Sequence, residues 1–125
     1  MIKGAEMIVG TLKNTYAFPI LPEQSVDDYK SKIELFLKRA PKGSILIADL
    51  FGGTTSNVAA ALSKQYDVLA VSGLDMAMLI AATELREEYE GNELIEKLIE
   101  KSKENCKNIG KMLREASLRN HDNKN

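Results

Sequence analysis

A stretch of twelve residues, 44–55 (SILIADLFGGTT), constrains the fold of this chain more than any other. An apolar run from Ile45 to Ala48 leads directly into Asp49, and a glycine pair and hydroxyl residues follow. An apolar run without polar alternation is typical of a strand buried on both faces, as in a parallel sheet flanked by helices. We therefore expect a buried strand that ends at Asp49.

Asp49 would lie at the carboxyl end of that strand, which is where open α/β sheets bind their ligands. Gly52 and Gly53 allow a sharp turn and a close approach of the backbone. A helix is expected to follow, and its first N–H groups have no partner within the helix and attract anions. The residues that can cap this helix are Thr54, Thr55, Ser56 and Asn57.

A purely structural interpretation stands beside the functional one. Strand, tight turn and capped helix form a common unit of α/β proteins, and in such a unit Asp49 would only tie down the loop. The sequence has neither a Gly-x-Gly-x-x-Gly pattern nor a glycine loop ending in Gly-Lys-Ser/Thr, which argues against a nucleotide site. We expect no cofactor and no metal.

The composition indicates one globular domain. The chain has 125 residues, of which 44% are hydrophobic and 28% charged, and its formal net charge of -1 predicts no nucleic-acid partner. The single cysteine, Cys106, excludes an internal disulfide and fits a reducing cytoplasm. Because Cys106 falls on an apolar stripe of helical spacing, we expect a buried structural thiol. No apolar run approaches the roughly 20 residues that span a bilayer.

Helical and strand patterns alternate along the chain. The expected elements are a helix over 1–9 closed by Gly10, a short strand over 15–20, a helix opened by Ser25 and ended at 41–43, the buried strand over 45–49, a helix over 54–65, a second buried strand over 67–72, a helix capped by Asp75, and a long apolar stripe from Leu94 to Leu113. This order favours an α/β doubly wound parallel sheet flanked by helices in three layers. The domain would cover 1–119, and 120–125 would be a frayed polar tail.

The order of these motifs resembles a known family, the mannose-type enzyme IIA domain of the phosphoenolpyruvate-dependent sugar phosphotransferase system. The Asp-Leu-Phe-Gly-Gly segment is its most specific part. The matching segments are 5–10 (AEMIVG), 49–54 (DLFGGT), 57–60 (NVAA) and 71–79 (VSGLDMAML). They occur in the family's order over nearly the whole chain.

In that family a histidine at the end of the first strand accepts a phosphoryl group from HPr and passes it to a IIB component. The resemblance implies that Asp49 orients this histidine and that Thr54 helps to hold the phosphoryl group. The residues implied in phosphate binding are Phe51, Gly52, Gly53 and Thr54, and those implied in partner binding are Leu74, Asp75 and Met76. It also implies a homodimer and a peripheral association with membrane IIC and IID components.

The sequence departs from the family pattern at its beginning. The family's first strand, which ends in Ser/Asn-His-Gly, precedes the first helix, whereas this chain begins at that helix. The only histidine is His121, in the polar tail. We therefore expect that the first strand is missing, through a misplaced start or a real truncation, and that this chain cannot carry phosphate. Smaller departures are Thr55 and Ser56 in place of Pro-Phe, and Asp75 and Ala77 in place of Asn and Pro.

Two further functions remain open at the level of sequence. The chain is either a phosphoryl carrier or a non-catalytic relative that binds a phosphotransferase partner and regulates it. The DNA upstream of Met1 discriminates between them, since a carrier requires an in-frame apolar strand ending in His-Gly. A phosphoryl donor for dihydroxyacetone kinase is a third possibility, and neighbouring kinase genes would indicate it.

Overall fold

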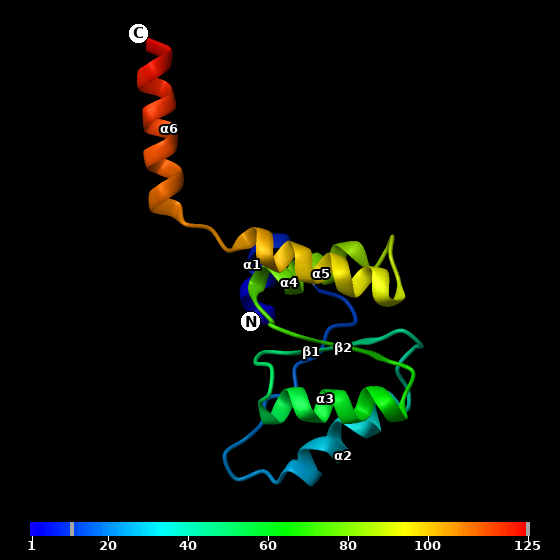
Figure 1. Cartoon of the computed structure of the whole chain (residues 1–125). Helices are drawn as coiled ribbons and strands as arrows, with labels where there is room; N and C mark the ends of the chain where they lie inside the picture. Colours follow the sequence, from blue (N-terminus) through cyan, green and yellow to red (C-terminus); the bar gives the residue numbers. More distant parts are fainter. Residues whose placement is uncertain (11, 125) are drawn as a thin grey trace.

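The computed structural model describes residues 1–10 and 12–124, except for the side chains of Ile8 and of residues 121–124. Two parallel strands, β1 (Ile45–Ala48) and β2 (Leu69–Ser72), lie between layers of helices (Figure 1). The helices are α1 (Ile2–Val9), α2 (Val26–Leu37), α3 (Thr54–Gln65), α4 (Met76–Leu85), α5 (Gly91–Asn105) and α6 (Ile109–Lys124). Helices α2 and α3 cover one face of the sheet, and α1, α4 and α5 lie on the other (Figure 1). The expected α/β sheet flanked by helices is confirmed.

The side chains of β1 alternate between two hydrophobic cores. Ile45 and Ile47 pack against the core of β2, α4 and α5, whereas Leu46 packs against the core of α2 and α3. The first core contains the buried side chains of Val71, Met78, Ala81, Ala82, Leu94, Ile95 and Leu98, and the second those of Tyr29, Ile33, Leu37, Val58 and Leu62. Because each face of this strand packs on a hydrophobic core, neither face carries polar side chains. This explains the unbroken apolar run.

Three helix ends follow local signals in the sequence. The Ser25 hydroxyl accepts a 3.1 Å hydrogen bond from the Asp28 N–H and so caps α2. Asp75 caps α4 in the same way through the Met78 N–H, at 2.7 Å. Gly10 ends α1 with a φ of 88°, a conformation that glycine adopts at little cost. All three ends were predicted.

The strand expected over residues 15–20 is wrong. A segment becomes a strand only when its backbone pairs with a neighbour, and the sheet of the described residues contains only β1 and β2. Side chains hold the segment instead. The rings of Tyr16 and Phe18 pack on Phe36 of α2, with centroid distances of 4.4 and 5.5 Å, and the Tyr29 hydroxyl donates to the Phe18 carbonyl.

The long apolar stripe does not form one helix, and the expected burial of Cys106 is also wrong. Helix α5 ends at Asn105, and Cys106 follows it in an extended conformation with its side chain exposed. Asn108 then caps a new helix, since its side chain accepts a 3.0 Å bond from the Lys111 N–H. No other element contacts α6 among the described residues, so burial of its apolar side chains does not fix its direction.

Helix α6 projects away from the rest of the molecule and carries the chain to Lys124 (Figure 1). The backbone of residues 120–124, which was expected to fray, is therefore helical, and Asn125 lies outside the described residues. In the part of the chain that the structure describes, no helix has the length and apolar character needed to cross a membrane.

Candidate functional site

The carboxyl ends of β1 and β2 meet at one edge of the sheet. The Leu74 N–H, just beyond β2, donates a 3.0 Å hydrogen bond to the Ala48 carbonyl at the end of β1. Asp49 and Asp75 follow the two strands and therefore lie at this same edge. In Figure 1 both connecting loops leave the sheet on the side where the N-terminus lies. The structure thus brings together the residues of the two predicted segments, 49–54 and 74–76.

A tight turn follows Asp49. The Gly53 N–H donates to the Leu50 carbonyl at 3.3 Å, and Gly52 has a φ of 84°. A glycine with positive φ at the third position is the signature of a type II turn. Phe51 is the second residue of this turn, at its tip, and its side chain is 84% exposed. No hydrogen bond of its side chain holds it, because a phenyl ring has neither donor nor acceptor.

The Asp49 carboxylate is exposed and fixed through one oxygen. Its Oδ1 accepts a 2.8 Å bond from the Leu50 N–H and a 3.0 Å bond from the Thr55 hydroxyl. The Thr55 hydrogen bond, and after it the Leu50 N–H, holds the pKa of Asp49 below its ordinary value, although partial desolvation acts in the opposite direction. The Oδ2 atom accepts no hydrogen bond from the described residues.

The prediction that a polar side chain caps α3 is wrong. The N-cap residue is Gly53, and no side chain accepts a hydrogen bond there. The Thr55 hydroxyl turns back to Asp49 instead, whereas Thr54 is the first residue of α3 and is exposed. Sequence reasoning had singled out Thr54 beside Asp49. The helical turn decides between the two threonines, since successive side chains point about 100° apart.

Tyr29 of α2 is a buried residue of the core between α2 and α3. Burial raises the pKa of its hydroxyl, and the negative charge of Asp49 raises this pKa further. Its hydroxyl donates to the Phe18 carbonyl and so ties the segment before α2 to this helix. In the sequence Tyr29 showed only the helical spacing of a core residue.

The residues implied in partner binding are partly engaged within the molecule. The Oδ2 of Asp75 accepts a 2.6 Å bond from the Ser102 hydroxyl, while its Oδ1 caps α4. The methyl end of Met76 lies against Gly4 of α1, where an added Cβ would be only 2.9 Å away. Leu74 is half-buried. Ser102 was missed in the sequence, although it lies three and four residues after Ile99 and Leu98 on the inner face of α5.

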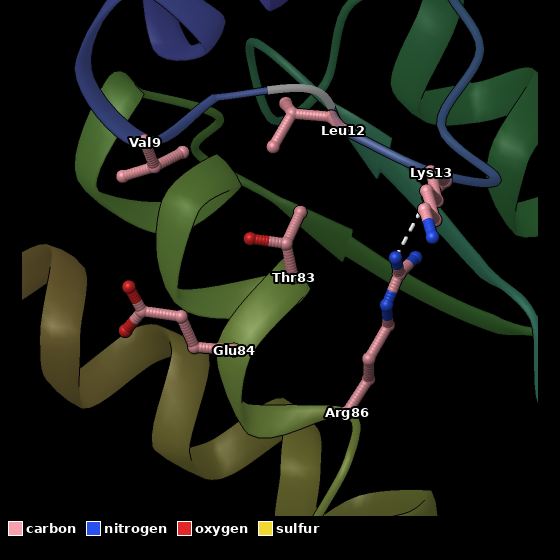
Figure 2. A pocket seen from close by; sticks show the side chains of 6 residues that line it. All are labelled: Val9, Leu12, Lys13, Thr83, Glu84 and Arg86. Carbon is pink, nitrogen blue, oxygen red and sulfur yellow. Dashed lines mark hydrogen bonds between the residues drawn. The ribbon is translucent and has the colours of Figure 1, made fainter.

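A hollow of about 260 Å³ lies at the opposite end of α4 and includes none of these residues. Figure 2 shows the Arg86 guanidinium reaching toward the loop after α1, where it donates a 2.7 Å bond to the Lys13 carbonyl. The hollow is lined by Val9, Leu12, Lys13, Thr83, Glu84 and Arg86. The Arg86 contact joins the end of α4 to the loop after α1. The hollow shares no residue with the turn around Asp49, so the candidate site is centred on Asp49.

Fold and site together define a class of α/β protein in which an exposed carboxylate and a tight glycine turn stand at the carboxyl edge of a parallel sheet. Within the described residues no group of acidic, histidine and cysteine side chains is arranged to bind a metal ion. Such an edge positions polar groups around a ligand. An exposed carboxylate with one oxygen that accepts no bond from the described residues can accept a further hydrogen bond from a ligand.

Comparisons with known proteins identify the class. The profile of the EIIA-man family, described as PTS system fructose IIA component, matches residues 1–99. The chain therefore belongs to this family of phosphotransferase system IIA components. No curated protein sequence matches it significantly.

Solved structures of similar proteins share the fold. The phosphotransferase component EIIA from Streptococcus agalactiae has a TM-score of 0.80 and 24% identity, over 87% of this chain and 86% of that one. The mannose/sorbose specific IIA subunit from Enterococcus faecalis has a TM-score of 0.77 and 28% identity, over 85% and 81%. A PTS IIA protein associated with the fucose utilization operon of Streptococcus pneumoniae has a TM-score of 0.67 and 21% identity, over 89% and 84%. The family resemblance predicted from the sequence is confirmed.

Proposed function

We propose that the protein serves as the phosphoryl-carrying IIA component of a sugar phosphotransferase system, receiving phosphate from HPr and passing it to a IIB protein. The observation that carries this proposal is the Asp49 carboxylate. Its Oδ1 is held by Thr55 and by the loop, and its Oδ2 faces no donor among the described residues. That oxygen is free to accept the N–H of a histidine.

Asp49 would act as a positioning residue for this imidazole. A carboxylate that binds one ring nitrogen fixes the tautomer, so that the other nitrogen carries the lone pair that attacks phosphorus. The negative charge also stabilises the imidazolium that forms with the phosphoryl group. The lowered pKa of Asp49 keeps the carboxylate ionised throughout the physiological range.

The phosphoryl group would lie over the turn and the start of α3. The first N–H groups of this helix point to the same edge as Asp49, and no side chain caps them. Phe51, Gly52, Gly53 and Thr54 are the residues of this turn, and we assign them to phosphate binding. Leu74, Asp75 and Met76 would form the adjoining part of the partner-binding surface.

The histidine itself would come from residues that precede Met1 in a longer form of the protein, because the only histidine of the chain, His121, lies in α6. We further propose that the protein works in the cytoplasm as a homodimer, with peripheral attachment to membrane IIC and IID components. These statements rest on family membership.

The test begins with the DNA upstream of the Met1 codon. The proposal expects an in-frame apolar strand that ends in His-Gly. The extended protein should then take phosphate from phosphoenolpyruvate through enzyme I and HPr and deliver it to IIB. Asp49→Asn should slow this transfer by roughly 10²–10⁴-fold, the usual value of an acid–base or orienting group.

Asp67→Asn serves as the matched control. Asp67 precedes β2 at the opposite edge of the sheet, and its carboxylate forms an exposed ion pair with Lys42, at 3.8 Å. This variant should transfer phosphate at the parent rate. Equal rates of phosphoryl transfer for the parent and Asp49→Asn would refute the proposed role. They would indicate that Asp49 only stabilises the loop.

A non-catalytic regulator is the second candidate, and the sequence of this chain favours it in one respect. The one histidine in the sequence, His121, belongs to α6, a helix that contacts no other described element. If the upstream DNA encodes no histidine strand and the chain still binds HPr or IIB, regulation by binding replaces phosphate transfer.

A further inference from the structure

Thr55 begins the packed face of α3. This helix buries Val58, Ala59 and Leu62, which lie three, four and seven residues after Thr55. Residues at these spacings share one face of a helix. Thr55 is accordingly half-buried, whereas Thr54 is exposed. Packing of α3 against the domain therefore sets the position of the Thr55 hydroxyl.

Two hydrogen bonds from different parts of the chain meet at one oxygen of Asp49. The Leu50 N–H donates to Oδ1 at 2.8 Å, and the Thr55 hydroxyl donates to the same atom at 3.0 Å. The Leu50 bond alone leaves an exposed carboxylate free to rotate, because χ2 of aspartate is broad and its two oxygens are equivalent acceptors. Thr55 lies six residues away on a packed helix, so its bond fixes the direction in which Oδ2 points.

We propose that Thr55 is a second positioning residue for phosphoryl transfer, which acts through Asp49 by aiming its Oδ2 at the imidazole N–H. The inference rests on the proposed function and adds to it. Thr55 is a position where this sequence departs from the family pattern, so family membership assigns it no role. A hydroxyl has one proton to donate, and Thr55 donates it to Asp49, so phosphate binding does not explain this residue.

The bond to Thr55 also acts on the charge of Asp49. It is the largest cause of the lowered pKa of this carboxyl. A carboxylate that balances an imidazolium has to be ionised, so loss of the hydroxyl should move the acid side of the pH–rate profile to higher pH. A residue that served only the stability of α3 would not shift this profile.

The test measures single-turnover transfer from purified phospho-HPr to the extended protein, whose upstream strand supplies the histidine. Thr55→Val keeps the shape of the side chain and removes its hydroxyl. It should lower kcat by roughly 10–100-fold, the order of loss expected from a misplaced reacting group, and leave KM for phospho-HPr within about twofold. Thr55→Ser keeps the hydroxyl and should restore most of the rate and the parent pH profile.

Thr83→Val is the matched control. Thr83 is also half-buried and helical, and its hydroxyl also donates one bond, at 2.8 Å to the Ile80 carbonyl. It lies in the hollow at the far end of α4, away from Asp49. This variant should transfer phosphate at the parent rate. Equal losses of rate in Thr83→Val and Thr55→Val would mean a general effect of removing a hydroxyl bond and would overturn the positioning role.

A second measurement needs no phosphate transfer. In the 125-residue chain, three-bond NMR couplings of the Asp49 carboxyl carbon to its backbone nitrogen and carbonyl carbon report χ1. They should indicate one rotamer in the parent and in Thr55→Ser, and averaging over rotamers in Thr55→Val. Averaged couplings in the parent would refute the proposed geometry.

The remaining outcomes separate this inference from the function on which it rests. If the extended parent transfers phosphate and Thr55→Val does so at the same rate, Thr55 has no positioning role and the proposed function stands. A raised KM with an unchanged kcat would mean that the hydroxyl contacts HPr, which also overturns the inference. If the extended parent takes no phosphate, the proposed function fails and the positioning role fails with it, whatever the couplings of Asp49.

Discussion

The Thr55 hydroxyl donates a 3.0 Å hydrogen bond to the Oδ1 of Asp49 and so joins the first turn of α3 to the end of β1. Its bond is the largest cause of the lowered pKa of Asp49. A hydrogen bond to the ionised form of a carboxylate favours that form. The same contact therefore sets both the orientation and the charge of the proposed positioning residue.

Removing this hydroxyl should raise the pKa of Asp49. In Thr55→Val the carboxylate keeps the Leu50 N–H but loses its first donor, so the pKa moves toward its ordinary value. Because the folded pKa is depressed, the bond contributes stability above the ordinary pKa, and this contribution is lost as the pH falls through the lowered value. Carboxyl titration by NMR measures the shift.

Thr54→Val is the matched control for this substitution. Thr54 is exposed and its hydroxyl is not the one bonded to Asp49. The Asp49 titration should be unchanged in this variant. A rise of the Asp49 pKa in Thr54→Val with no rise in Thr55→Val would contradict the geometry of the site.

The 125-residue chain should not be phosphorylated on histidine by phosphoenolpyruvate, enzyme I and HPr. The proposed reaction requires an imidazole beside Asp49, and the only histidine in the sequence, His121, lies in α6, which contacts no other described element. Incubation with labelled phosphoenolpyruvate checks this. Acid-labile phosphate label on the protein that disappears in His121→Gln would contradict the prediction.

Gly52→Ala should destabilise the turn that follows Asp49. Gly52 has a φ of 84°, and an L-residue in this conformation costs about 1–2 kcal/mol. Urea unfolding should show a loss of this size. Gly53→Ser is the control, since Gly53 is extended and is the N-cap of α3, where serine is a preferred residue. A loss as large in Gly53→Ser as in Gly52→Ala would show that any side chain is excluded from the turn.

Asp75 and Ser102 should be coupled in stability. Asp75→Ala removes both the cap of α4 and the bond to Ser102, whereas Ser102→Ala removes only the second. Loss of an N-cap costs about 0.5–2 kcal/mol, and loss of a hydrogen bond about 0.5–1.5 kcal/mol. A double-mutant cycle by urea unfolding should show that Ser102→Ala has little effect once Asp75 is alanine. Strictly additive losses would indicate that the bond contributes nothing.

Removal of residues 107–125 should leave the melting temperature of the domain unchanged. These residues include all of α6, which contributes no contact to either core among the described residues. Leu98→Ala is the contrasting variant, because Leu98 of α5 is fully buried in the core that α5 forms with α4 and β2, and its truncation costs about 2–5 kcal/mol. A marked drop in the melting temperature on removing α6 would show that the helix packs on the domain.

Part of this structure could be predicted because it depends on neighbours in the chain. The unbroken apolar run 45–48 predicts a strand with a core on each face, and Ser25 and Asp75 each cap a helix through a hydrogen bond to a residue three positions ahead. The turn after Asp49, in which Gly52 has a positive φ, also depends only on residues adjacent in the chain. Such features are settled within a few residues, so periodicity and capping chemistry predict them.

Tertiary structure decided the rest, because it depends on which surfaces meet. Residues 15–20 have the composition of a strand but pair with none, so aromatic packing on Phe36 fixes them instead. Cys106 falls on an apolar stripe, yet the chain leaves the core at Asn105. The sequence by itself determined that Asp49 directly follows a strand with a core on each face, although three of the four residues of that strand are only half-buried. That Thr55 holds Asp49, and that Ser102 holds Asp75 from 27 residues away, required the fold, because local pattern does not specify contacts between elements.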